Sequence, residues 1–254
     1  SNGIVSPIGT NLCAQIYTVS ATDQAGCVAS MSVNITQPTA LTVTITPTDP
    51  KCFGSSDGFG IAAAFGGTPN YSYLWSDGGT SATSNPLTAN NYGLSVTDGN
   101  GCVVTSSMAL VNPPAMAASI TSTNVSCFGA CNGIATATST NGIGAVSYAW
   151  VGGSNPINSQ TAMNLCAATY TMTSTDQNGC IAVAQVVITE PTVLTASISS
   201  TGSVTCNGGT DGFAVVNAGG GTTPYSYSWS GAASANGNSS NANNLPAGIF
   251  TVTV

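Results

Sequence analysis

The chain has 254 residues, and only 4% of them are charged: eight acids, one base and no histidine give a net charge of −7. The single base, Lys51, cannot neutralise the phosphates of a nucleic acid or hold a basic helix on an anionic membrane. The lack of histidine removes the usual general base and metal ligand, so composition disfavours an enzyme. No apolar run reaches the roughly 18 residues of a membrane span, so we do not expect this segment to cross a membrane.

Three sequence landmarks recur along the chain at spacings of 75 to 79 residues. They are Cys52-Phe53-Gly54, Cys127-Phe128-Gly129 and Cys206-Asn207-Gly208; Tyr73-Leu74-Trp75, Tyr148-Ala149-Trp150 and Tyr227-Ser228-Trp229; and the turns from Asp23 to Cys27, from Asp98 to Cys102 and from Asp176 to Cys180. A fixed period of this size indicates a tandem array of small repeated units.

A proline follows each of these turns by 11 residues, at Pro38, Pro113 and Pro191. We interpret the prolines as boundaries between repeats. They divide the chain into a partial repeat with C-terminal strands only (1–39), two whole repeats (40–115 and 116–192) and a partial repeat lacking its last strand (193–254). Both ends of the chain fall inside a repeat, so we expect the natural polypeptide to continue in both directions.

Within a repeat, apolar and polar residues alternate, as at Tyr71, Tyr73 and Trp75. A period of two indicates strands with one buried face, and turn residues punctuate the chain with the rhythm of a sandwich. The sequence therefore predicts an all-β fold of immunoglobulin-like β-sandwich repeats arranged end to end. In residues 40–115 we expect seven strands, over 41–47, 58–66, 71–76, 79–83, 84–88, 91–97 and 102–111.

The aromatic residues of these strands are expected in the core. A buried tryptophan on the third strand and a tyrosine at the start of the sixth are typical of immunoglobulin-like sandwiches. The predicted core residues are Tyr73, Trp75, Tyr92, Tyr148, Trp150, Tyr170, Tyr227, Trp229 and Phe250.

The segments from Cys206 to Gly212, from Pro224 to Trp229 and from Leu245 to Val254, together with the Gly-Cys turns of the earlier units, resemble the SprB-type repeat of giant cell-surface adhesins of gliding Bacteroidetes. The strand order also resembles PKD-type immunoglobulin-like domains. The resemblance covers essentially the whole chain. It implies export, by the type IX route, and a role in surface adhesion or filaments. Residues 116–192 depart from the pattern, because they carry an extra cysteine pair and lack the Pro-Tyr that precedes the tryptophan.

The extra cysteines, Cys131 and Cys166, occur together in one repeat, and recurring cysteines favour an oxidising compartment. In a seven-strand sandwich the loops that carry them lie at the same end. We therefore predict a Cys131–Cys166 disulfide, whose 35-residue loop is worth roughly 3–4 kcal/mol. Cys13 aligns with Cys166, and we expect its partner before Ser1.

The other cysteines leave two pairings open. Cys52 and Cys102 fall at opposite ends of a seven-strand sandwich, much farther apart than the roughly 4.4–6.8 Å between the Cα atoms of a disulfide. We therefore favour a bond between repeats, from Cys52 to Cys180. By the same rule Cys127 and Cys206 pair beyond Val254, and Cys27 and Cys102 pair before Ser1. The alternative is bonding within a repeat, Cys52–Cys102 and Cys127–Cys180, which an even number of strands would allow.

Metal sites are weakly indicated. Asp57, Asp77, Asp98 and Asp211 each precede a glycine, which is ordinary turn chemistry, whereas calcium needs several carboxylates close together. Zinc at Cys127 and Cys131 would lack a second pair of ligands. We expect turns and no cofactor, with calcium as the minor alternative.

Taken together, these patterns predict a non-enzymatic, extracellular, disulfide-bonded protein at the cell surface. We expect it to form the shaft of a surface adhesin or an extracellular filament, with itself, neighbouring repeats or surface glycans as partners. The alternative is an array of carbohydrate-binding modules in a secreted protein, for which Phe53 and Phe128 are the candidate exposed contacts.

Overall fold

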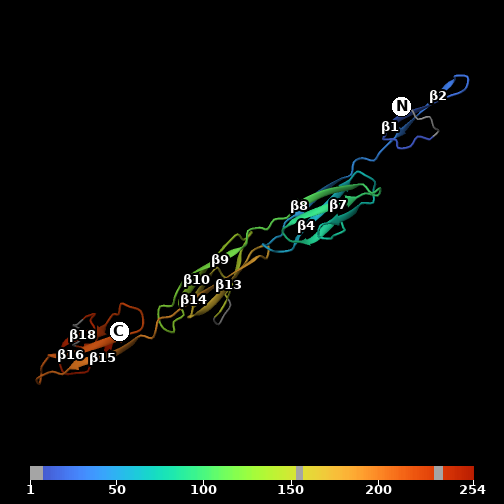
Figure 1. Cartoon of the computed structure of the whole chain (residues 1–254). Helices are drawn as coiled ribbons and strands as arrows, with labels where there is room; N and C mark the ends of the chain where they lie inside the picture. The colour runs from blue at the N-terminus through green and yellow to red at the C-terminus, as the bar shows by residue number, and fades with distance from the viewer. Residues whose placement is uncertain (1–7, 153–156, 232–236) are drawn as a thin grey trace. The chain divides into compact units, whose positions relative to one another are not determined.

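The computed structural model describes residues 8–152, 157–231 and 237–254, and every regular element in them is a β-strand. The chain divides into two compact units, Ser1–Pro113 and Pro114–Val254. Figure 1 shows their strands, coloured by residue number. No helix long and apolar enough to cross a membrane occurs in the described part of the chain. The three repeat boundaries expected from the prolines stay a prediction.

The first unit contains a hairpin and a sandwich. Strands β1 (Gln15–Thr22) and β2 (Val28–Ile35) pair antiparallel, from Gln15↔Ile35 to Thr22↔Val28. The sandwich has two three-stranded sheets, in the orders β3-β4-β6 and β5-β7-β8. Its strands are β3 (Thr42–Thr48), β4 (Gly58–Phe65), β5 (Ser72–Trp75), β6 (Thr83–Leu87), β7 (Asn91–Thr97) and β8 (Val103–Ala109).

The second unit repeats this topology. One sandwich has sheets β12-β10-β9 and β11-β13-β14, and further strands form sheets β15-β16-β18 and β17-β19. The first group comprises β9 (Ala117–Thr123), β10 (Gly133–Thr140), β11 (Ser147–Val151), β12 (Thr161–Leu165), β13 (Ala168–Thr175) and β14 (Ile181–Ile188). The second comprises β15 (Thr195–Gly202), β16 (Gly212–Gly219), β17 (Ser228–Trp229), β18 (Asn241–Leu245) and β19 (Val252–Thr253). The fold is therefore an all-β tandem array of immunoglobulin-like sandwiches.

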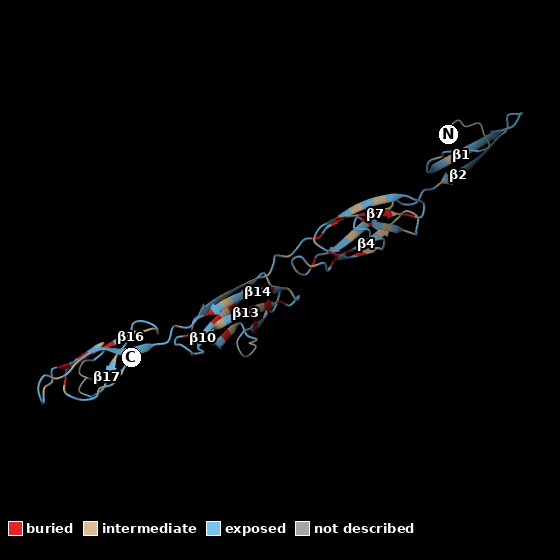
Figure 2. Cartoon of the chain, turned by 60° about the horizontal axis from the view of Figure 1, so that its bottom comes forward, coloured by how far each residue is buried: buried red, intermediate tan, exposed pale blue. Residues whose placement is uncertain are grey.

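Each sandwich is built around one tryptophan. Trp75, Trp150 and Trp229 are at most 5% exposed, and each donates its indole N–H to a serine carbonyl oxygen 2.8–2.9 Å away. Figure 2 shows the buried residues inside the sandwiches, with exposed residues outside. Of the other predicted core residues, Tyr92 and Tyr170 are buried, whereas Tyr73, Tyr148, Tyr227 and Phe250 are half-buried against the same clusters.

The expected strand over 79–83 is wrong. Residues 40–115, all described, form six strands, because the chain turns tightly after Trp75: its N–H donates to the Gly79 carbonyl oxygen (2.8 Å), and Gly78 has a φ of 93°. Residues 76–82 still return across the sandwich as an irregular segment, since β5 and β6 both run toward the same end. The loop after β3 and the turn between β7 and β8 therefore lie at opposite ends, as the seven-strand prediction required.

Candidate functional site

The two ends of each sandwich carry the recurring cysteines. In the first sandwich the chain arrives at what we call the leading end, where Thr42 pairs with Phe65 and Thr97 with Val103. It departs from the trailing end, where Gly58 pairs with Leu87 and Asn91 with Ala109. The corresponding ends of the second sandwich are marked by the pairs Thr175↔Ile181 and Gly133↔Leu165.

The trailing loop of the first sandwich, residues 51–57, is a compact turn around Cys52. The Cys52 carbonyl oxygen accepts the Ser55 N–H (3.1 Å), and the Asp57 carboxylate accepts the Lys51 N–H (3.1 Å) and the Ser55 hydroxyl (2.5 Å). The two bonds that the Asp57 carboxylate accepts lower its pKa, the bond from the Ser55 hydroxyl most. The turn presents Phe53 to solvent, with 63% of its surface exposed.

The same turn recurs in the next two repeats. Ser126 and Thr205 stand where Lys51 does, and their N–H groups donate to side-chain oxygens of Asn132 and Asp211, both at 3.0 Å. The Thr205 hydroxyl also donates to Asp211 and is the first cause of a lowered pKa there. The Asp-Gly that follows the cysteine is therefore a turn element, and Asn132 can replace the aspartate because only an oxygen acceptor is needed.

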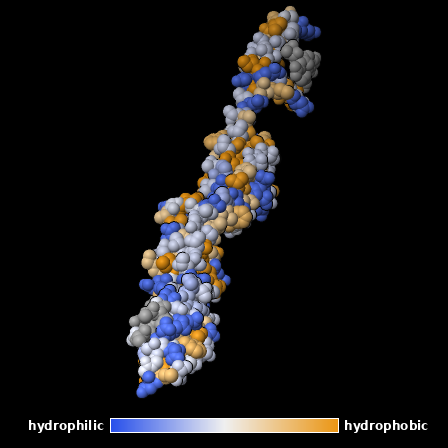
Figure 3. Space-filling model, turned by 90° about the vertical axis from the view of Figure 1, so that its left-hand side faces the viewer, coloured by the Kyte–Doolittle hydropathy of each residue, from blue (hydrophilic) through white to orange (hydrophobic). Residues whose placement is uncertain are grey.

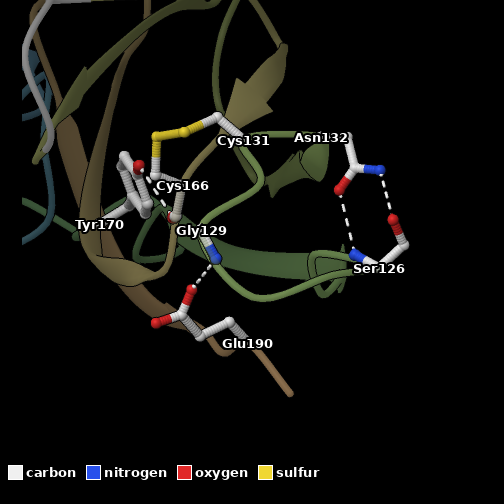
Figure 4. The surroundings of a disulfide bond; sticks show 7 residues. All are labelled: Ser126, Gly129, Cys131, Asn132, Cys166, Tyr170 and Glu190. Atoms are coloured by element: carbon white, nitrogen blue, oxygen red, sulfur yellow. Dashed lines mark hydrogen bonds between the residues drawn. A yellow bond between two sulfur atoms is a disulfide. The ribbon is translucent and has the colours of Figure 1, made fainter. Parts of the chain in front are cut away.

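The trailing loop is bound to the departing chain. In the first sandwich the Gly54 N–H donates to Asn112 Oδ1 (3.0 Å), 58 residues later in the sequence. In the second, the Gly129 N–H donates to Glu190 Oε2 (2.7 Å), as Figure 4 shows. Each trailing loop is thereby held beside the segment that leaves its sandwich.

The leading turn is organised by a buried aspartate. Asp98 is 5% exposed; its Oδ1 accepts the N–H groups of Asn100 (2.9 Å) and Cys102 (2.8 Å), and its Oδ2 accepts that of Thr68 (2.9 Å). The bond from Thr68 contributes most to a lowered pKa of Asp98, against burial, which raises it. A buried carboxylate is stable here because three N–H groups replace its water.

Asp176 repeats this arrangement in the second sandwich. It accepts N–H groups from Asn178, Cys180 and Ile143, each at 2.9 Å, and the bond from Ile143 contributes most to its lowered pKa. In the first hairpin, Asp23 likewise accepts the Cys27 N–H (2.8 Å). The Asp-x-x-Gly-Cys motif is thus a turn that fixes the cysteine backbone and also ties the turn to the loop after the second strand of each sandwich.

One disulfide lies at the trailing end of the second sandwich. It joins Cys131, in the loop before β10, to Cys166, between β12 and β13 (Figure 4). The Tyr170 hydroxyl donates to the Cys166 carbonyl oxygen at 3.2 Å. The structure therefore brings together the two cysteines whose co-occurrence suggested a bond.

The bonds considered within a repeat are not formed. Cys102 and Cys127 are free and exposed, so neither Cys52–Cys102 nor Cys127–Cys180 exists. Their positions explain this result, because Cys52 and Cys127 lie at trailing ends and Cys102 and Cys180 at leading ends. Cys13, Cys27 and Cys206 are also free and exposed.

The described residues contain no group of three or more His, Cys, Asp or Glu side chains that could hold a metal ion. The carboxylates considered for calcium are used by the protein itself: besides those above, Asp77 accepts the Ser84 hydroxyl (2.5 Å) and the Gly79 N–H (3.1 Å). Both bonds lower its pKa, the serine bond most. Each aspartate considered for calcium therefore serves a turn.

Exposed aromatic residues are few. All eight tyrosines and three tryptophans lie in the described residues, and none is exposed. The exposed aromatic side chains are phenylalanines: Phe53, Phe65, Phe128 and Phe213. On the face shown in Figure 3, hydrophobic residues are scattered among hydrophilic ones and form no continuous band.

Comparison with known proteins gives one family and distant structural likenesses. A family model described as the SprB repeat matches residues 44–80, 119–155 and 198–234, each spanning a trailing loop and the core tryptophan. Three N-terminal domains of the bacteriophage RB49 highly immunogenic outer capsid protein (Hoc) are 19% identical over 75% of both chains, with a TM-score of 0.41. The N-terminal four Ig domains of Dscam1 isoform 6.9 are 12% identical over 97% of this chain and 74% of that chain, with a TM-score of 0.21. No curated protein matches the chain in sequence.

Proposed function

Because the chain carries three SprB repeats, we propose that it forms part of the shaft of an extracellular adhesin or filament at the cell surface. One observation carries the proposal: in both complete sandwiches the chain arrives at one end and departs from the other. A domain with this connectivity can be repeated many times without its neighbours competing for the same surface. It serves a shaft, whose task is to span distance.

The chemistry of the surface supports a passive role outside the cell. With 4% charged residues and no histidine, almost nothing titrates between pH 5 and 8, and there are few charges for salt to screen. The cysteine content and the Cys131–Cys166 bond fit an oxidising compartment. The aspartate carboxylates accept hydrogen bonds within turns, which supports a structural protein over an enzyme.

Electron microscopy of the purified 254-residue chain tests the shaft. Strands of about eight residues at roughly 3.3 Å each, with their loops, give about 30–40 Å per repeat. We expect rods, and added copies of residues 40–192 should lengthen them by about 60–80 Å each. Compact particles that do not lengthen with added repeats would contradict the proposal.

Location and ligand need separate experiments. Labelling of intact cells with an antibody against the chain should stain the surface, and staining only after lysis would contradict an extracellular shaft.

A glycan array tests the alternative of carbohydrate-binding modules. We expect no hits, because binding platforms need exposed aromatic rings, and here no tyrosine or tryptophan is exposed. A hit that Phe53→Ala abolished would favour the alternative.

A further inference from the structure

Both sides of the joint between the two complete sandwiches are bound to cysteine-bearing loops. On the first side, Asn112 accepts the Gly54 N–H (3.0 Å), two residues after Cys52. The Val111 N–H also donates to Asp49 Oδ1 (2.8 Å), just before the same loop. The departing chain is therefore bound on both sides of Cys52 in the sequence, at Asp49 and at Gly54.

On the second side, the arriving chain is held beside the turn that carries Cys180. The Asn141 side chain donates to the Ala115 carbonyl oxygen (3.0 Å). The next residue, Gly142, lies between Met116 and Asp176: a Cβ built on it would be 3.3 Å from the Met116 methyl carbon and 3.4 Å from Asp176 Cβ. Asp176 in turn accepts the Cys180 N–H (2.9 Å).

Very little chain separates these two anchored points. From Asn112 to Ala115 there are three peptide links, which span at most about 11 Å between Cα atoms. The residues between them are Pro113 and Pro114. Proline fixes its own φ and restricts the residue before it to extended conformations, so these few links of backbone stay extended.

From this geometry we propose that Cys52 and Cys180 form a disulfide across the joint, linking the trailing end of one sandwich to the leading end of the next. The alternatives within each sandwich fail on distance, since a strand of seven or eight residues, roughly 23–26 Å long, separates its two ends. A disulfide tolerates only about 4.4–6.8 Å between Cα atoms. The inference concerns the bond itself and holds whether or not the chain is a shaft.

Formation of the bond is an oxidation that requires an acceptor. The two thiols lose two electrons and two protons as the Sγ–Sγ bond forms, and a disulfide oxidant, such as a thiol–disulfide oxidoreductase or a small disulfide, is reduced to two thiols. The loops carrying Cys52 and Cys180 are ordered by their own hydrogen bonds, so the thiolate of either cysteine attacks a mixed disulfide on the other with little further ordering.

Peptide mapping without reduction tests the pairing directly. The full chain is expressed in an oxidising compartment, its free thiols are alkylated in acidic denaturant, and it is cleaved before aspartate and after Glu190. We expect the peptide 49–56, containing Cys52, to be linked to the peptide 176–190, containing Cys180, and reduction should separate them. Cys180 linked to another peptide, Cys52 linked to the peptide that contains Cys102, or alkylated Cys52 and Cys180 would each overturn the proposal.

Two serine variants make the assignment specific. Cys52→Ser should abolish the linked peptide and leave Cys180 open to alkylation. Cys127→Ser, at the same position in the next trailing loop, should leave the linked peptide unchanged. If the linked peptide survives Cys52→Ser, the assignment is wrong; rods without the linked peptide would disprove this bond while leaving the proposed shaft intact.

Discussion

The Tyr170 hydroxyl donates a hydrogen bond to the carbonyl oxygen of Cys166, 3.2 Å away, so a core tyrosine directly supports one half of a disulfide. Tyr92 makes the same bond to the Thr88 carbonyl oxygen (3.0 Å) in the first sandwich, which has no disulfide at that position. Phe250 stands at this position in the last repeat and has no hydroxyl. This hydrogen bond, which we call the corner bond, therefore occurs in both complete sandwiches, and the disulfide adds to it in one of them.

Removing the corner hydroxyl should weaken each sandwich modestly. Tyr92→Phe or Tyr170→Phe keeps the buried ring and loses one hydrogen bond, so we expect the free energy of unfolding to fall by about 1 kcal/mol. Denaturant unfolding of the chain measures the change. Tyr73→Phe is the matched control, because its half-buried ring packs on the core without a corner bond, and it should change stability by less; equal effects at Tyr73 and Tyr92 would contradict the role of the corner.

Loss of the Cys131–Cys166 disulfide should destabilise the second sandwich alone. The bond closes a loop of 35 residues, and the double variant Cys131→Ser, Cys166→Ser should lose roughly 3–4 kcal/mol. Hydrogen–deuterium exchange localises the effect: protection should fall in strands β9 to β14 and stay unchanged in β3 to β8. An equal loss of protection in both sandwiches would show that they do not unfold independently.

The leading turns should make stability fall in acid. Asp98 and Asp176 have folded-state pKa values below the ordinary 3.8, so their carboxylates stabilise the folded chain above that pH. This stabilisation is lost as pH falls from about 4 through the lower folded-state pKa values. Between pH 5 and 8 unfolding should hardly depend on pH.

The substitutions Asp98→Asn and Asp176→Asn isolate this effect. Each removes the charge and an acceptor at constant size, so each variant should unfold more easily than the parent near pH 7. The gap should narrow progressively below about pH 4, as the parent carboxylates become protonated. Unfolding curves measured from pH 7 to pH 2 give the comparison, and a gap that stayed constant over this range would rule out the charge as its source.

Gly101 offers a clean test of backbone conformation in the same turn. Its φ is 83°, and no atom lies within 4 Å of a Cβ built on it, so Gly101→Ala costs only the left-handed conformation, about 1–2 kcal/mol. Gly93, in strand β7, has no positive φ, and a Cβ built on it would meet only Ser76 Cβ, 4.0 Å away, so Gly93→Ala should be neutral or stabilise by up to about 1 kcal/mol. Thermal unfolding compares the two variants. A destabilised Gly93→Ala with an unaffected Gly101→Ala would contradict a cost from the left-handed conformation.

Local patterns predicted the fold because they act over a few residues. The alternation around Trp75 and the tyrosine at position 92 require only strands with one buried face, and the structure has them. The strand expected over 79–83 failed because the apolar period does not register the tight turn at Gly78. The bonds from Thr68 to Asp98 and from Gly54 to Asn112 join residues 30 and 58 positions apart, and no periodicity reports contacts of that kind.

A Cys52–Cys180 bond has a mechanical consequence if the chain is a shaft under tension. Force would pass along β3, across the sulfur bridge and along β14, bypassing the 128 residues from Cys52 to Cys180. Pulling single molecules of the full chain should therefore release a further length of roughly 420–460 Å after a reductant is added, at about 3.3–3.6 Å per residue. Without reductant, Cys180→Ser should release this length except for the 35 residues closed by Cys131–Cys166, roughly 115–125 Å. Cys127→Ser should behave as the parent chain does. A gain on reduction of only about 115–125 Å in the parent chain, the length closed by Cys131–Cys166, would show that the joint carries no covalent bridge.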